Sequence, residues 1–148
     1  MSSELPVRVQ RTNLVVADLE RAFRIYRDLL GFKVEFVLEQ GEQYAYTVFK
    51  IPREAKTRFA TLSSKSQLRS LALTEVSGID LPKPSQPNSH ALVLEVDDFE
   101  GTLERAHAEG LQIYPEEELH THDGRVGREI GMLDHDGHLI VIYCILQT

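Results

Sequence analysis

The sequence has 148 residues, of which 42% are hydrophobic and 26% are charged, the balance of an ordinary globular chain. This length predicts one domain, residues 1–148, with a buried core. The formal net charge of −7 argues against nucleic acid as a partner, because nucleic-acid-binding proteins need basic patches to displace counterions. No apolar stretch reaches the length of a membrane span and no secretory signal stands at the start, so we expect a cytoplasmic protein with no membrane partner.

A single cysteine, Cys144, lies in the apolar run 139–146. One cysteine cannot form a disulfide within the chain, which excludes a disulfide-stabilised scaffold. Cys144 could be a nucleophile, but free cysteines in apolar strands are more often inert packing residues. We therefore interpret Cys144 as a core residue.

Two segments of the chain, residues 7–33 and 89–113, share one pattern. In each, a β-rich run ends in Val-x-Asp and an apolar residue, a helical segment follows, and a glycine precedes the next strand. Asp18 and Asp98 stand where a helix N-cap is expected, since a carboxylate there accepts hydrogen bonds from free amides of the first turn. The repeat predicts two modules of the same construction.

Both helical segments are predicted to be amphipathic. Apolar residues of the first recur at intervals of three or four, which places them on one face: Leu19, Phe23, Tyr26 and Leu30. The second has a weaker stripe of the same kind: Phe99, Leu103 and Ala106. Gly31 and Gly110 suit the left-handed residue that often ends a helix.

Shorter β-like stretches follow each helix. They cover residues 33–38, 44–51 and 69–76 in the first half and 112–114, 128–133 and 138–146 in the second. The polar, proline-containing segment 77–88 reads as a linker. We therefore predict an α+β fold of two βαβββ modules, with module one over 7–76 and module two over 89–146. The segment 52–65 exceeds a tight turn and is interpreted as a lid, a dimer contact or a disordered excursion.

The turn Asp134-His135-Asp136-Gly137 separates the last two predicted strands and has hairpin chemistry. Its aspartates are expected to bond local amides. We interpret His135 and His138 as residues that merely decorate this turn.

Two such modules resemble the vicinal oxygen chelate superfamily, which includes glyoxalase I, extradiol dioxygenases, fosfomycin resistance enzymes and bleomycin resistance proteins. The resemblance spans residues 7–146 and rests on Asp18-Leu19, Leu30-Gly31-Phe32 and the closing turn 134–138, which departs by one residue from the common Asp-Pro-Asp-Gly. It implies a curved mixed sheet around a cup, and subunits that form a homodimer.

Enzymes of this family hold one divalent metal in the cup with four side chains, usually two histidines (or a glutamine) and two glutamates. Counted from the shared motifs, the resemblance places four other residues at these positions: Arg11, Ala72, Ala91 and Val141. A guanidinium repels a metal ion, and alanine and valine offer no donor atom. We therefore predict that the cup holds neither a metal nor another cofactor.

A displaced metal site is the main alternative. His90 and Glu75 lie near two of the expected ligand positions but have the wrong alternation for the cup face, unless a β-bulge turns His90 inward. His120 and His122 have the spacing of a metal clip, but their polar segment reads as a solvated loop.

The predicted cup lining is small and apolar with a few polar groups, which is the composition of a pocket for a small organic ligand. It consists of Arg11, Asn13, Ala72, Ala91, Val93, Glu95, Val141 and Tyr143. Arg11 is expected to pair either with an anionic group of the ligand or with Glu95. The resemblance to bleomycin resistance proteins, which sequester a ligand without a catalytic metal, favours a binding protein. The alternative is an enzyme of the lyase, isomerase or oxygenase class, using a displaced metal or metal-free acid–base groups such as Arg11, Glu95 or Tyr143.

Overall fold

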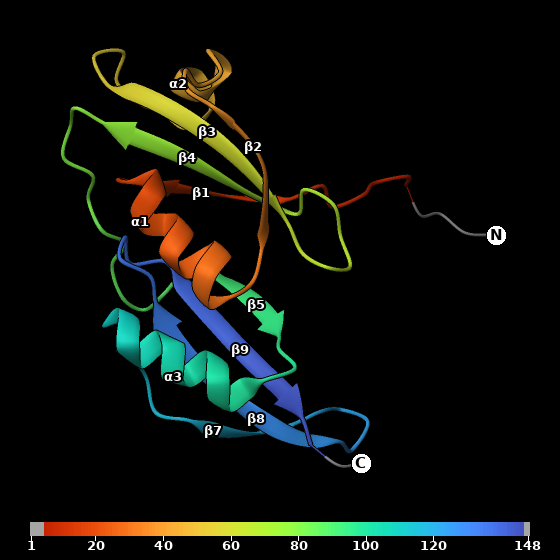
Figure 1. Cartoon of the computed structure of the whole chain (residues 1–148). Helices are drawn as coiled ribbons and strands as arrows, with labels where there is room; N and C mark the ends of the chain where they lie inside the picture. The colour runs from red at the N-terminus through yellow and green to blue at the C-terminus, as the bar shows by residue number, and fades with distance from the viewer. Residues whose placement is uncertain (1–4, 147–148) are drawn as a thin grey trace.

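The protein, described here by a computed structural model of residues 5–146, divides into two modules of similar construction (Figure 1). The first module contains β1 (Thr12–Val16), α1 (Leu19–Phe23), η1 (Arg24–Leu29), β2 (Lys33–Leu38), α2 (Tyr44–Val48), β3 (Lys56–Ser63) and β4 (Leu71–Ser77). The second contains β5 (Ala91–Glu95), α3 (Phe99–Glu109), β6 (Gln112–Ile113), β7 (Glu117–His120), β8 (Val126–Leu133) and β9 (Leu139–Ile145). The outermost residues of the predicted domain, 1–4 and 147–148, lie outside the described residues.

Each module forms its own sheet. The first has the strand order β1-β4-β3-β2, and the second has the order β5-β9-β8-β6 with β7 also paired to β8. The first strand of each module runs parallel to the last one, and all other pairs are antiparallel. The α+β prediction with two repeated modules is confirmed, but the curved surface is made of two sheets whose neighbouring edge strands, β1 and β5, are not paired in the described chain.

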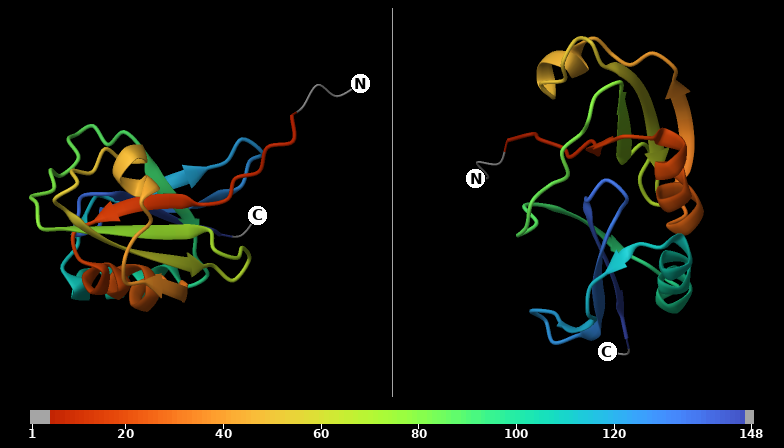
Figure 2. Two further views of the ribbon diagram at one scale, coloured as in Figure 1. Left: turned by 90° about the horizontal axis from the view of Figure 1, so that it is seen from above. Right: turned by 90° about the vertical axis from the view of Figure 1, so that its left-hand side faces the viewer.

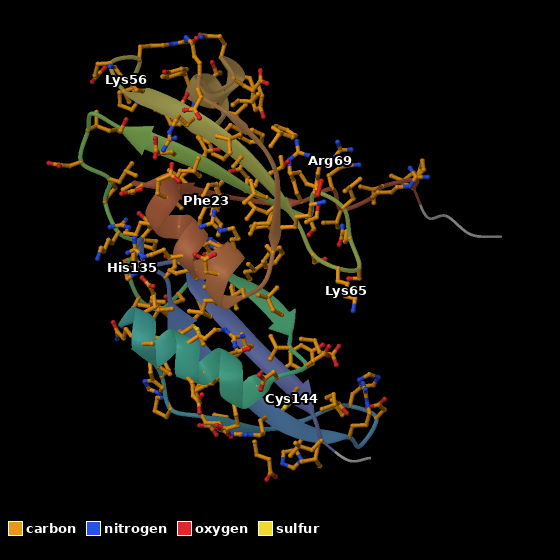
Figure 3. The ribbon with its side chains drawn as sticks, viewed as in Figure 1. Phe23, Lys56, Lys65, Arg69, His135 and Cys144 are labelled. Carbon is orange, nitrogen blue, oxygen red and sulfur yellow. The ribbon has the colours of Figure 1, made fainter. Side chains whose placement is uncertain are left out.

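The helices α1, η1 and α3 cover the same side of both sheets, and α2 lies on the opposite side of the first sheet (Figure 2). The main core fills the space between the sheets and these three helices, and it joins both modules. It includes Leu14, Val16, Leu19, Tyr26, Leu71, Leu73, Phe99, Ile140 and Ile142. Cys144 of β9 packs against this core, as its apolar surroundings in the sequence predicted (Figure 3).

The predicted helix starts are confirmed. The carboxylate of Asp18 accepts from the amide of Arg21 at 3.1 Å, and that of Asp98 accepts from the amide of Gly101 at 2.9 Å. The first helix then widens into a π-helical turn, in which the amide of Leu30 donates to the carbonyl of Ile25, five residues back, at 2.9 Å. In this wider turn Leu29, which the predicted stripe did not include, is buried in the core, and the predicted Leu30 is partly buried against it.

Two predictions for the first module are wrong. Residues 44–51 do not form a strand: residues 44–48 are the helix α2, whose Ala45 packs with Ile51, Ala55 and Val76 against the inner side of the sheet. The segment 52–65 is neither a lid nor disordered, because residues 56–63 are the long strand β3, hydrogen-bonded to β2 on one side and to β4 on the other.

In the second module, residues 117–120 form the strand β7, which was not predicted. The segment that contains His120 and His122 is therefore partly a strand and not wholly a loop. No helix within residues 5–146 combines the length and the apolar character that crossing a membrane requires.

Candidate functional site

Strand alternation separates a helix-facing side of each sheet from an inner side. In β1 and β4, Leu14, Val16, Leu71 and Leu73 enter the core beneath the helices, so the alternate residues face inward. The same holds for Ile140 and Ile142 of β9. In β5, Leu92 and Leu94 pack against the same core. The predicted cup residues that belong to strands therefore lie on the inner side: Asn13, Ala72, Ala91, Val93, Glu95, Val141 and Tyr143. Arg11 precedes β1 and lines the groove between β1 and β5.

Strand register brings these residues into rows. Asn13 stands opposite Ala72 in the first sheet, and Val93 stands opposite Val141 in the second. One step further along, Glu95 stands opposite Tyr143, which in turn stands opposite Glu129 of β8. The inner side of the second sheet thus carries an acid–phenol–acid row beside an apolar one.

The two halves of the predicted cup differ in exposure. Ala72 is fully buried, and Asn13 is half-buried with its amide oxygen accepting from the hydroxyl of Thr74 at 3.0 Å. The cluster around α2 and the linker fills the neighbouring part of this side. On the second sheet, by contrast, Val93 is 57% exposed. Apart from the exposed Arg11, the accessible residues of the predicted lining therefore belong to the second module.

Two cavities meet at β5. One, of about 410 Å³, lies between the start of β1 and β5, and its lining includes Arg11, Val93 and Glu95. The other, of about 340 Å³, lies over the second sheet and is lined by Val93, Glu95 and Tyr143 together with residues that the sequence analysis did not include: Leu119, Thr121, Arg125, Glu129 and Ile145. Glu129 could have been found, since Ile130 and Met132 of the same strand are core residues and alternation turns Glu129 inward.

The residues that the sequence analysis predicts at the family's metal-ligand positions do not fit a metal. Arg11, Ala72, Ala91 and Val141 supply no donor atom, and within residues 5–146 no group of three or more His, Cys, Asp or Glu side chains could hold an ion. His120 is exposed, and its Nε2 lies 2.6 Å from Glu118 Oε1.

Glu75, the carboxylate considered for a displaced metal site, points to the helix side. Its Oε2 accepts from the amide of Leu19 at 2.7 Å, and both of its oxygens accept from the guanidinium of Arg58 at 2.8 Å. The Arg58 guanidinium holds the pKa of Glu75 below its usual range. Glu75 thus accepts a hydrogen bond from the first residue of α1, and its carboxylate does not face the inner side of the sheet.

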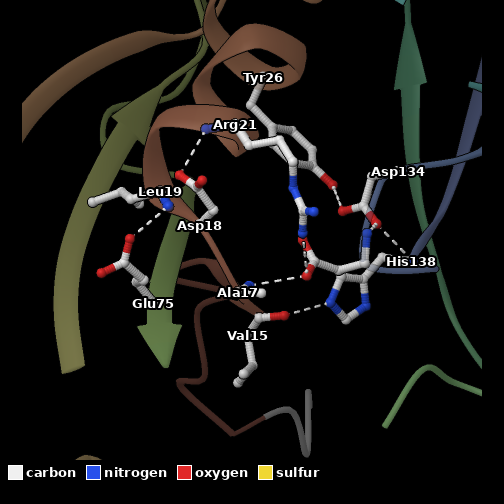
Figure 4. Close-up of polar contacts among 10 residues, drawn as sticks. Val15, Ala17, Asp18, Leu19, Arg21, Tyr26, Glu75, Asp134 and His138 are labelled. Carbon is white, nitrogen blue, oxygen red and sulfur yellow. Dashed lines mark hydrogen bonds and ion pairs between the residues drawn. The ribbon is translucent and has the colours of Figure 1, made fainter. Parts of the chain in front are cut away.

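The turn after β8 joins the two modules (Figure 4). The phenol of Tyr26 donates to Asp134 Oδ2 at 2.7 Å, and Asp134 Oδ1 accepts from the amides of Asp136 and His138 at 2.9 and 2.8 Å. Burial and the adjacent Asp134 carboxylate raise the pKa of Tyr26. The expected local bonds of Asp134 are present, and the buried bond to Tyr26 adds a link to the first module.

The same turn also contacts the end of β1. Asp136 Oδ1 accepts from the amide of Ala17 at 2.9 Å and from Arg21 Nη2 at 3.0 Å. His138 Nε2 lies 2.7 Å from the carbonyl oxygen of Val15, which can only accept, so this nitrogen donates.

His135 lies at the boundary between the modules, with Nε2 2.9 Å from Glu109 Oε2 (Figure 3). The interpretation of His135 and His138 as decoration is therefore wrong. His138 binds across the module boundary, and His135 ties the turn to α3. The contacts of Asp136 and His138 thus connect the closing turn to the end of β1.

Comparison with known proteins places the chain in a family. A family model described as the Glyoxalase/Bleomycin resistance protein/Dioxygenase superfamily matches residues 8–142. The comparison with curated proteins finds no match.

Solved structures share the fold at low sequence identity. A glyoxalase family protein from Bacillus cereus superposes with a TM-score of 0.74 at 16% identity, covering 99% of each chain. A glyoxylase/bleomycin resistance protein/dioxygenase domain from Frankia sp. has a TM-score of 0.67 at 20% identity, covering 95% of this chain and 93% of the other. The fosfomycin resistance protein FosX from Mesorhizobium loti has a TM-score of 0.55 at 19% identity, covering 97% of this chain and 93% of the other. Since the family model covers nearly the whole chain, the protein belongs to the glyoxalase, bleomycin resistance protein and dioxygenase superfamily.

Proposed function

We propose that this protein binds a small organic molecule on the inner side of its second sheet, without a metal, in the manner of bleomycin-resistance-type members that sequester a ligand. The observation that carries the proposal is the accessible apolar surface of Val93, continuous with Leu119, Tyr143 and Ile145 along one cavity. Ligand sites combine an apolar surface with polar groups that orient the ligand. In this cavity three apolar side chains adjoin polar and charged ones: Val93, Leu119 and Ile145 beside Glu95, Thr121, Arg125, Glu129 and Tyr143.

The polar groups at the edge of this surface suggest what the ligand carries. Glu95 and Glu129 place two carboxylates on either side of the Tyr143 phenol, while Arg125 lines the same cavity. Two acceptors flanking an aromatic ring suit a molecule with a ring system and an amine or another hydrogen-bond donor. Arg11 lines the adjoining cavity, where it is available to an anionic group.

Binding is favoured over catalysis by the geometry of the lining. Nucleophilic catalysis requires a nucleophile within hydrogen-bond reach of a base. Among the described lining residues, Tyr143 makes no hydrogen bond to Glu95 or Glu129, and Cys144 packs on the other side of its strand. We further propose a homodimer with a cytoplasmic location.

A ligand screen tests the binding proposal. Small aromatic amines and carboxylic acids are screened by thermal shift, and the purified protein is examined by native mass spectrometry for co-purified molecules. A true ligand at 100 times its Kd stabilises the folded state by about 2.7 kcal/mol, which raises the Tm by about 5–10 °C.

The matched variants then locate the site. Val93→Asp is expected to weaken binding of the hit about tenfold or more, because it places a charge on the apolar surface. Val48→Asp, at an equally exposed valine on α2, is the control and leaves the affinity unchanged. If both variants bind the hit as tightly as the wild type does, the ligand binds elsewhere. If the protein converts the bound molecule into a product, it is an enzyme that uses Glu95 or Tyr143 without a metal.

Metal removal provides an independent prediction. Because the four family ligand positions carry no donor atoms, incubation with EDTA is expected to change neither the Tm nor ligand binding. Elemental analysis measures the metal content directly. About one tightly held nickel, zinc, iron or manganese ion per chain would contradict the metal-free proposal.

A further inference from the structure

The groove between the start of β1 and β5 contains a cation and an anion that do not pair with each other. Among the described residues that line it, only Arg11 and Glu95 are charged. Within residues 5–146 neither of these side chains forms an ion pair. Two opposite charges therefore line one cavity of about 410 Å³ and are available to a ligand.

The rest of this groove is lined by uncharged side chains. Five of them carry hydroxyl or amide groups that can form further hydrogen bonds to a polar ligand: Thr12, Ser64, Ser66, Gln67 and Ser70. The others are apolar. A ligand in the groove therefore meets one positive charge, one negative charge and a wall that is otherwise neutral.

Strand β5 connects this groove with the cavity over the second sheet. Val93 and Glu95 line both cavities, and the start of β1 lies on the side to which β5 points (Figure 1). Glu95 stands opposite Tyr143, beyond which the second cavity continues along Leu119 and Ile145. A ligand whose charged end lies in the groove can therefore extend an apolar part over Val93 toward Tyr143.

The other charges of the second cavity do not take part in this arrangement. The guanidinium of Arg125 is paired with Asp123, with Nε 3.2 Å from Oδ1, so its charge is already matched. Glu129 lies beyond Tyr143, two strands away from Glu95, which corresponds to about 10 Å across the sheet. A compact charged group therefore finds an adjacent cation and anion at the groove and not over the second sheet.

We propose that the ligand is a free α-amino acid with an aromatic or large aliphatic side chain. Its carboxylate binds the guanidinium of Arg11, and its ammonium group binds the carboxylate of Glu95, both through charge-assisted hydrogen bonds. Its side chain lies over Val93 and beside the phenol of Tyr143. This inference rests on the binding function proposed above and names the class of the ligand.

The two opposite charges select against molecules that carry a single charge. A monocarboxylate bound to Arg11 brings its negative charge close to Glu95, and a monoamine bound to Glu95 brings its positive charge close to Arg11. A zwitterion meets an opposite charge at both ends, so attraction to the correct ligand and repulsion of the wrong ones act together. The apolar surface of Val93 adds a requirement for a large side chain, because burial of apolar area stabilises the complex.

Three probes of similar size test the inference on the full-length protein by isothermal titration calorimetry. They are phenylalanine, phenethylamine, which lacks the carboxylate, and 3-phenylpropanoate, which lacks the ammonium group. Phenylalanine is expected to bind at least about tenfold more tightly than either analogue. Arg11→Gln lowers the affinity for phenylalanine about tenfold or more but does not lower that for phenethylamine. Glu95→Gln lowers the affinity for phenylalanine equally but does not lower that for 3-phenylpropanoate.

Controls separate recognition of the zwitterion from general effects of charge. Lys33→Gln and Glu118→Gln remove exposed charges from β2 and β7 and are expected to leave all three affinities unchanged, and circular dichroism verifies that each variant is folded. Phenylalanine that binds no more tightly than both analogues overturns the inference, as does its failure to bind at about 10 mM. Equal loss of all three probes in Arg11→Gln and Glu95→Gln also overturns it. None of these outcomes contradicts binding on the second sheet, which the ligand screen and Val93→Asp test separately.

Discussion

Asp134→Ala is expected to lower the free energy of unfolding by about 3–5 kcal/mol, the largest effect of any single substitution proposed for this protein. Asp134 is 5% exposed and accepts three hydrogen bonds, from the phenol of Tyr26 and from the amides of Asp136 and His138. Its removal leaves a buried phenol without a partner, since Tyr26 is fully enclosed in the core. Urea denaturation followed by circular dichroism measures the loss.

Tyr26→Phe and Asp123→Ala show how much of this loss of stability comes from the buried hydrogen bond to Tyr26. Tyr26→Phe removes only the buried donor and is expected to cost about 1–2 kcal/mol, because Asp134 keeps its two amide donors. Asp123→Ala, at an exposed aspartate in the turn between β7 and β8, serves as the control and changes stability by no more than about 0.5 kcal/mol. If Asp134→Ala unfolds at the same urea concentration as the wild type, the turn does not hold the two modules together.

Glu75→Gln is expected to destabilise the protein by about 2–3 kcal/mol at neutral pH. The substitution removes the negative charge that forms the bidentate ion pair with the guanidinium of Arg58. It also weakens the acceptor of the hydrogen bond from the amide of Leu19 at the start of α1. Glu39→Gln is the matched control, because Glu39 also contacts Arg58, at 3.3 Å, but its side chain is 76% exposed. We expect about 0.5 kcal/mol or less for the control.

The same carboxylate predicts a dependence on pH. Since Arg58 holds the pKa of Glu75 below its unfolded value, the contribution of Glu75 is present above that unfolded value, about 4.3, and is lost as the pH falls through the lower folded value. The wild type should therefore lose more stability on acidification than Glu75→Gln does. The difference between the two pH profiles isolates Glu75 from other paired carboxylates, and parallel profiles would show that the ion pair contributes nothing.

The division of the inner surface alters what the fold implies for function. In the first module, the cluster around α2 fills part of the inner side, and Ala72 is buried. In the second module, Val93, Glu95 and Tyr143 line open cavities. The accessible side chains on the inner side of the second sheet are therefore the part of the inner surface that α2 does not cover.

Local patterns in the sequence were sufficient for the helix starts, the strand–helix–strand repeat and the inner side of the strands. Asp18 and Asp98 accept hydrogen bonds from amides three residues along the chain, so their capping role depends only on residues within one helical turn. Alternation in β5 and β9 is likewise a property of neighbouring residues. For the same reason, Ala91, Val93 and Val141 could be assigned to one side of a sheet without coordinates.

Local preference misled the prediction where the surroundings outweigh it. Residues 44–51 are rich in aromatic and β-branched side chains, which favour a strand, yet residues 44–48 form α2. The helix buries Ala45 against Val76 and lets the phenol of Tyr46 donate to the carbonyl of Ala55 at 2.8 Å. β-propensity depends on the surface that a segment packs against, and that surface was formed by residues far along the chain.

The sequence by itself determined the repeated architecture and the family, because both follow from residue types at fixed short spacings. Only the tertiary structure decided that the turn after β8 joins the modules and that the inner surface is open in one module and filled in the other. His138 and Val15 are separated by 123 positions, and Asp136 and Ala17 by 119. Contacts between such distant residues have no periodicity to detect, since they arise from the packing of elements that must first be assembled.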